Sequence, residues 1–146
     1  MIRLCFLTAI LLFFTCHYSL AQTTLSSDSK EIDVLPEYPG GYKSFFKYIS
    51  KEFKFPKSAL KSQYLGKVLI TMIVEADGKV TVDSLDFSKM NYYGKKADDT
   101  LKAEAREDVE SEIRKMFGNM PSWKPGSING RPIRVKYNLP YNLGLE

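Results

Sequence analysis

The chain has little cysteine and histidine, and both residue types lie only near its amino terminus. Its two cysteines and one histidine are Cys5, Cys16 and His17. Residues 22–146 therefore contain no thiol and no imidazole, which excludes a disulfide, a thiolate nucleophile, a histidine-based triad and a zinc site of sulfur or imidazole ligands there. Carboxylates, hydroxyls, amines and tyrosines remain, and we expect neither a metal nor another cofactor.

A strong charge of either sign is also missing. The net charge of +4 at pH 7 is too small to predict a nucleic-acid-binding face, which needs concentrated basic residues. In contrast, 44% of the residues are hydrophobic and 13% are aromatic. This composition excludes a disordered chain and predicts one globular domain with a core of its own.

The one long apolar run lies at the start of the chain. Arg3 precedes apolar residues 4–14, and small residues follow up to Ala21. This pattern predicts a signal peptide over residues 1–21, with cleavage after Ala21 and no stable membrane span afterwards. The run is shorter than the about 20 residues that span a bilayer. An uncleaved inner-membrane anchor is one alternative, and a lipoprotein modified at Cys16 is another, although Phe13 and Phe14 fit a lipobox poorly.

Residues 22–34 are mostly polar and predict a flexible leader, so we assign the folded domain to residues 35–146. Two prolines and two glycines at residues 35–41 predict a rigid turn. A helix follows, because apolar residues recur at helical spacing. They are Tyr42, Phe45, Phe46, Ile49 and Phe53. Lys43, Lys47 and Lys51 line its other face, which either faces solvent over a packed stripe or lies on anionic lipid.

A β-hairpin is predicted in the middle of the chain. After a short helix over residues 57–63, residues 66–75 and 80–87 have strand composition, and Asp77-Gly78 between them suits a tight turn. The apolar parity changes along the second strand, which indicates a bulge near Asp83-Ser84. Residues 88–97 are polar and predict a loop.

A long charged helix is predicted from Asp98 or Asp99, either of which can cap it, to Phe117. Its apolar stripe predicts one buried face, and its first part, residues 98–112, either packs across the sheet or offers a second surface. Trp123 follows in a proline-rich turn and either plugs the core or serves as a stacking platform for a ligand. Residues 133–141 then alternate apolar and polar side chains, which predicts a third strand.

The chain contains, in this order, the segments Pro36-Glu37-Tyr38-Pro39-Gly40-Gly41, Gly66-Lys67-Val68, Asp77-Gly78-Lys79-Val80, Met120-Pro121-Ser122-Trp123-Lys124-Pro125-Gly126, Asn129-Gly130-Arg131-Pro132 and Leu139-Pro140. In the same order, these segments resemble the C-terminal domain of TonB in the form found in Bacteroidetes-type envelopes. The resemblance covers about residues 35–143. It implies an α+β fold in two layers, a three-stranded antiparallel sheet packed by helices. It also implies a periplasmic module that pairs a peptide segment of an outer-membrane receptor with its last strand.

Two departures from that family limit the expectation. A full transducer has an inner-membrane anchor and a long proline-rich linker, whereas residues 22–34 would extend only ~45 Å at about 3.4 Å per residue. We therefore do not expect this chain to transmit force between two membranes. The second departure is the added length of the charged helix over residues 98–112.

Peptide capture is also expected on physical grounds, since the edge of a sheet leaves backbone groups for an incoming strand. The expected binding strand consists of Ile133, Arg134, Val135, Lys136, Tyr137, Asn138 and Leu139. Arg134, Lys136 and Asn138 would favour acidic or polar peptides, and Pro140 would end the pairing. Alternatively, the leader covers this edge, or a second copy pairs with it to form a homodimer.

Other function classes receive less support from the sequence. Asp77, Asp83 and Asp86, or Glu37, are the candidates for acid–base chemistry or for a calcium site, but their spacing matches neither, so we expect no enzyme. The sequence thus predicts a protein-binding module for TonB-dependent transport across the outer membrane. The alternative is a soluble envelope adaptor or competitor that binds a non-receptor partner through the same edge.

Overall fold

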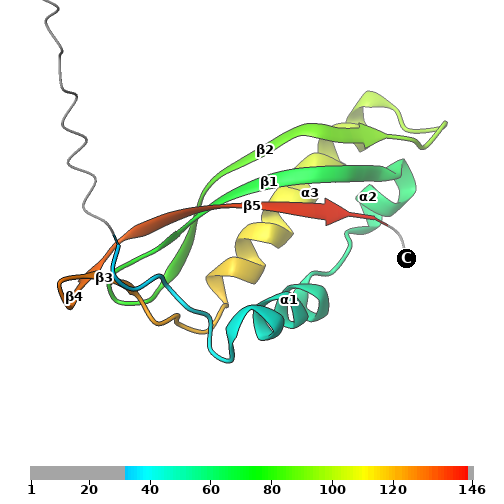
Figure 1. Ribbon diagram of the computed structural model, residues 1–146. Helices are drawn as coiled ribbons and strands as arrows, with labels where there is room; N and C mark the ends of the chain where they lie inside the picture. Colours follow the sequence, from blue (N-terminus) through cyan, green and yellow to red (C-terminus); the bar gives the residue numbers. More distant parts are fainter. Residues whose placement is uncertain (1–31, 145–146) are drawn as a thin grey trace, which may run out of the picture.

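The computed structural model describes residues 32–144, so the expected signal peptide and most of the expected leader lie outside the described residues. In chain order the elements are α1 (Gly41–Glu52), α2 (Lys57–Ser62), β1 (Tyr64–Val74), β2 (Val80–Tyr92), α3 (Asp99–Gly118), β3 (Gly126–Ile128), β4 (Arg131–Ile133) and β5 (Val135–Leu143). In Figure 1, β2, β1 and β5 lie side by side, with α3 crossing the sheet and α1 on the β5 side. The predicted α+β fold with a three-stranded antiparallel sheet is confirmed.

The helices follow their sequence signals closely. Asp98 caps α3, because its Oδ1 accepts a hydrogen bond of 2.8 Å from the N–H of Leu101. The first turns of α3, which had two possible roles, pack inside the domain: Ala105 and Val109 are fully buried. In α1, Phe45 and Ile49 are buried as predicted, but Tyr42 is 77% exposed. The prediction that Tyr42 belongs to the core stripe is therefore wrong.

The hairpin of β1 and β2 is longer than predicted. Residues 88–92, expected in a loop, continue β2 to Tyr92, which lies opposite Tyr64 with the two rings stacked at 4.3 Å between centroids. The loop prediction is wrong there because pairing with β1 outweighs the polar composition of the segment. The register slips where Thr71 and Met72 face Ser84 and Val82, which leaves Asp83 as the extra residue of the predicted bulge.

The last strand is interrupted near its start. Ile133 belongs to β4, which pairs with β3 in a separate two-stranded sheet, and β5 begins only at Val135. The prediction of one strand over residues 133–141 is therefore wrong at its beginning. At its other end β5 continues past Pro140 to Leu143 in unbroken register with β1.

The core lies between the sheet and the helices. It joins residues of α1, β1 and α3, with Ile49, Val68, Ile70, Ile113 and Phe117 among the most buried side chains.

Residues 33 and 34, assigned to the leader by sequence, are paired: both of their N–H groups donate to the carbonyl of Ser127 in β3. No helix within residues 32–144 is long and apolar enough to cross a membrane.

Candidate functional site

The strand β5 forms one edge of the three-stranded sheet, whose order is β2, β1, β5. Within residues 32–144, β5 pairs with β1 and with no other strand. The described part of the leader lies elsewhere, because Val34 pairs with Ser127 and Glu37 pairs with Lys124. The described residues therefore do not cover the outer side of β5 with another strand.

Pro140 reveals which backbone groups of β5 face outward. In an antiparallel pair, alternate residues bond to the partner strand, and the residues between them point away from it. Proline has no N–H, yet the register with β1 runs unbroken through Leu69 and Pro140. Pro140 must therefore occupy an outward-facing position. Lys136 and Asn138 share its parity, so their N–H and C=O groups also point away from β1.

The opposite edge of the sheet, β2, is partly closed. Arg114 of α3 donates from its Nη1 to the carbonyl oxygen of Val82 over 3.2 Å. Further along, the N–H of Ser88 donates to Oδ1 of Asp86 over 2.8 Å. Bulges and side chains that occupy edge groups are known means of preventing strand addition. The two edges of the sheet thus differ, and β5 is the more accessible one.

The sequence-predicted site residues are only partly brought together. Val135, Lys136, Tyr137, Asn138 and Leu139 lie in β5, whereas Ile133 lies in β4 and Arg134 lies between the two strands. The five residues in β5 alternate as predicted: Lys136 and Asn138 are exposed, whereas Val135 is buried and Tyr137 and Leu139 are partly buried. The predicted strand site is therefore contiguous only from Val135 onward.

The cations of this segment are already paired. Nζ of Lys136 lies 2.8 Å from Oδ2 of Asp83, and Nε of Arg134 lies 3.2 Å from Oε1 of Glu75. The hydrogen bond from Lys136 is the main reason that the pKa of Asp83 is lowered. Because each cation has its own carboxylate, this surface carries no excess positive charge. The expected preference for acidic peptides loses its electrostatic basis.

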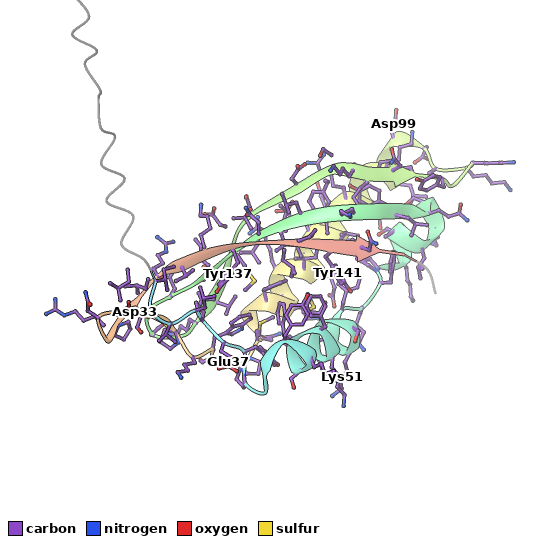
Figure 2. All side chains as sticks on the ribbon, viewed as in Figure 1. Asp33, Glu37, Lys51, Asp99, Tyr137 and Tyr141 are labelled. Carbon is purple, nitrogen blue, oxygen red and sulfur yellow. The ribbon has the colours of Figure 1, made fainter. Side chains whose placement is uncertain are left out.

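An apolar groove runs along the helix side of β5, and the sequence did not predict it. Its volume is about 320 Å³, and its walls come from segments far apart in the chain. Its lining includes Pro36, Tyr42, Phe45, Trp123, Tyr137 and Leu139. Figure 2 labels Tyr137 on β5 and Glu37 on the segment that leads into α1. The sequence signal for it was Trp123, for which a stacking platform for a ligand was one of the two expected roles.

Trp123 belongs to both the core and the groove. Its ring lies 5.1 Å from that of Phe45 and 5.6 Å from that of Tyr38, centroid to centroid, and its Nε1 donates to the sulfur of Met120. The ring centroids of Trp123 and Tyr137 lie 6.5 Å apart. Burial raises the pKa of Tyr137 above its ordinary value of 10.0.

Three of the carboxylates considered for catalysis accept hydrogen bonds. Asp77 accepts from the N–H of Lys79, Asp83 from Lys136 and Asp86 from Ser88. These hydrogen bonds lower the pKa of each carboxyl, which disfavours the protonated form that a general acid needs. Within residues 32–144, no group of three or more acidic side chains is placed to hold a metal ion.

Comparisons with known proteins add a likeness in fold. No protein-family model matches the chain, and no curated protein matches it. A solution structure of the C-terminal domain of Helicobacter pylori TonB is 24% identical, has a TM-score of 0.36, and the match covers 74% of this chain and 89% of that one. A second solution structure of that domain is 22% identical with a TM-score of 0.32, over 68% of this chain and 89% of that one.

Proposed function

We propose that the protein is a periplasmic peptide-binding module that captures an extended segment of a partner protein on the outer edge of β5. The observation that carries this proposal is the position of Lys136 and Asn138 in β5, which have the same parity as Pro140 and whose backbone groups therefore point away from β1. Their N–H and C=O groups lie on the edge of the sheet that the described residues leave without a second strand. An extended peptide is the ligand that satisfies such groups most completely.

The class of partner follows from the sequence motifs. Segments such as Pro36-Glu37-Tyr38-Pro39-Gly40-Gly41 resemble those of TonB C-terminal domains. We therefore propose that the captured segment belongs to the periplasm-facing, amino-terminal part of an outer-membrane receptor, in TonB-dependent transport. Export through the amino-terminal signal peptide, cleaved after Ala21, is part of this proposal.

The test is a binding titration with the protein as the cell processes it. Fluorescently labelled synthetic peptides from the amino-terminal segments of the host's outer-membrane receptors are titrated with the protein, and anisotropy is recorded. We expect saturable binding that an unlabelled peptide displaces. Absence of binding at high micromolar protein would refute the receptor assignment. Amino-terminal sequencing of the same preparation checks the cleavage site.

Two other outcomes would indicate a different partner for β5. Recovery of an envelope protein other than a receptor, displaced by a β5-directed peptide, would favour the adaptor function through the same edge. A dimer that forms through paired β5 strands would show in sedimentation as a mass that depends on concentration. Peptides that bind β5 would then compete with dimer formation, because both need the same backbone groups.

A further inference from the structure

We propose that the apolar groove between α1 and β5 binds side chains of the captured peptide and thereby selects a strand with apolar residues on one face. This inference rests on the proposed function and names the chemistry of its ligand. The ligand is an extended peptide that carries apolar side chains at every second position, directed toward α1, and small polar side chains at the positions between them.

The direction of the peptide side chains follows from strand geometry. A peptide strand added to β5 continues the pleat, so its residues opposite Tyr137 and Leu139 project to the same side of the sheet as those two side chains. That side carries the groove, because Tyr137 and Leu139 line it together with Tyr42 of α1. Peptide residues opposite Lys136 and Asn138 project to the other, solvent-facing side of the sheet.

The charge distribution favours apolar over acidic groove-facing side chains. None of the residues that line the groove carries a formal charge. A carboxylate or ammonium placed there would lose hydration without gaining an ion pair. On the solvent-facing side, Lys136 is already paired with Asp83, and the Asn138 side chain accepts a hydrogen bond from Thr71 over 3.0 Å. The electrostatic complement of this site is a neutral peptide strand.

The groove has an exposed aromatic wall. Tyr42 is 77% exposed and rests on Phe46, with 4.5 Å between ring centroids. An exposed aromatic ring beside an open strand edge is the kind of residue that contributes strongly when a partner covers it. Covering Tyr42 with a peptide side chain removes apolar surface of both partners from water.

The walls of the groove are held in place before any ligand arrives. The backbone of Glu37, next to Pro36, exchanges two hydrogen bonds with Lys124, at 3.0 and 2.9 Å. The N–H of Trp123 donates to the carbonyl of Gly78 over 2.8 Å. These bonds fix the segments on either side of the groove, and a fixed groove binds with a smaller loss of conformational entropy.

Three synthetic peptides test the inference with the processed protein. The parent peptide alternates valine with threonine and has charged ends for solubility. In the second peptide aspartate replaces each valine, and in the third aspartate replaces each threonine. Since burial of one aliphatic side chain contributes about 1.5–3 kcal/mol, we expect the second peptide to bind at least about tenfold more weakly than the parent. The third peptide should stay within about threefold of the parent, since its aspartates face solvent.

A pair of matched variants locates the effect on the protein. Tyr42→Ala should weaken binding of the parent peptide by about threefold to thirtyfold, with little effect on the second peptide. Tyr93→Ala is the control, because Tyr93 is also well exposed, at 60%, but lies beyond the end of β2. It should leave the affinity unchanged. Both residues are on the surface, so neither variant should unfold the protein.

The outcomes separate this inference from the proposed function. If the three peptides bind equally, or if Tyr42→Ala has no effect, the groove does not select side chains, but capture on β5 stands. If no peptide binds, the proposed function itself fails. A dimer that peptides cannot displace would assign the groove to a second copy. Affinity that appears only after removal of residues 22–31 would assign it to the chain's own leader. A dimer that peptides cannot displace, or affinity that depends on removal of residues 22–31, would each overturn the inference.

Discussion

Proline substitutions along β5 test the accessibility of its edge most directly. Lys136→Pro removes an N–H that points away from β1, whereas Tyr137→Pro removes one that bonds to β1 opposite Met72. The two positions are adjacent, so the two variants share their surroundings and differ chiefly in the direction of the lost donor. Lys136→Ala serves as the control for the loss of the lysine side chain and its ion pair with Asp83.

The expected magnitudes follow from what each variant leaves unpaired. Tyr137→Pro loses one backbone hydrogen bond and leaves the carbonyl of Met72, in a residue only 2% exposed, without a donor. A lost bond and an orphaned buried carbonyl together cost about 2–4 kcal/mol. Lys136→Pro should remain within about 1 kcal/mol of Lys136→Ala, because neither variant disturbs the pairing with β1.

Urea unfolding followed by circular dichroism measures both free energies, and the peptide titration measures capture. We expect Lys136→Pro to fold nearly as stably as Lys136→Ala but to bind the parent peptide more weakly, since one outward donor is missing. Native-state hydrogen exchange adds an independent measurement: the amides of Lys136 and Asn138 should exchange faster than those of Tyr137 and Leu139. If Lys136→Pro destabilises the fold as much as Tyr137→Pro, the Lys136 N–H is already bonded and the edge is not open.

Three further predictions concern the scaffold. Gly78→Ala should destabilise the domain by about 2 kcal/mol or more in urea unfolding. The reason is that φ is +85° at this position and that a Cβ would lie 2.2 Å from the carbonyl oxygen of Trp123. A change below about 0.5 kcal/mol, the usual effect of a surface substitution, would contradict this prediction. Ile113→Ala should lower the free energy of unfolding by about 2–5 kcal/mol, since the Ile113 side chain in α3 is fully buried. Ile113→Leu is the milder control. Burial, with a smaller contribution from Tyr92, raises the pKa of Tyr64 from 10.0 to about 12. The folded state thus holds this proton more tightly, so stability should fall between about pH 10 and 12 by up to about 1.4 kcal/mol per pH unit, and Tyr64→Phe should reduce that slope.

Local features of the structure were predictable because neighbouring residues determine them. Asp98 caps α3 through a bond to Leu101, three residues away. The Asp77-Gly78 turn joins β1 to β2, and its carboxylate accepts from Lys79. The bulge at Asp83 was visible as a change of apolar parity. In the first two cases the interacting groups lie within a few residues of one another, so sequence spacing alone carries the information.

Features that depend on distant segments were not predictable in this way. The polar residues 88–92 form a strand only because β1 supplies partners, including Tyr64 beneath Tyr92. Arg134 separates β4 from β5 because β4 pairs with β3 while β5 pairs with β1. Nothing in the local sequence of residues 131–143 marks that division.

The sequence by itself determined the alternating strand at the end of the chain, the helical stripes, the absence of thiol and imidazole chemistry after residue 21, and the proline that sets the parity of β5. Only the tertiary structure decided which edge of the sheet is accessible, because Arg114 reaches the carbonyl of Val82 across 32 positions of sequence. It also decided that an apolar groove lies beside β5, since the groove joins Pro36 and Tyr42 to Leu139. Side chains that come into contact only after folding have no characteristic spacing in the sequence, and the candidate site of this protein consists of such side chains.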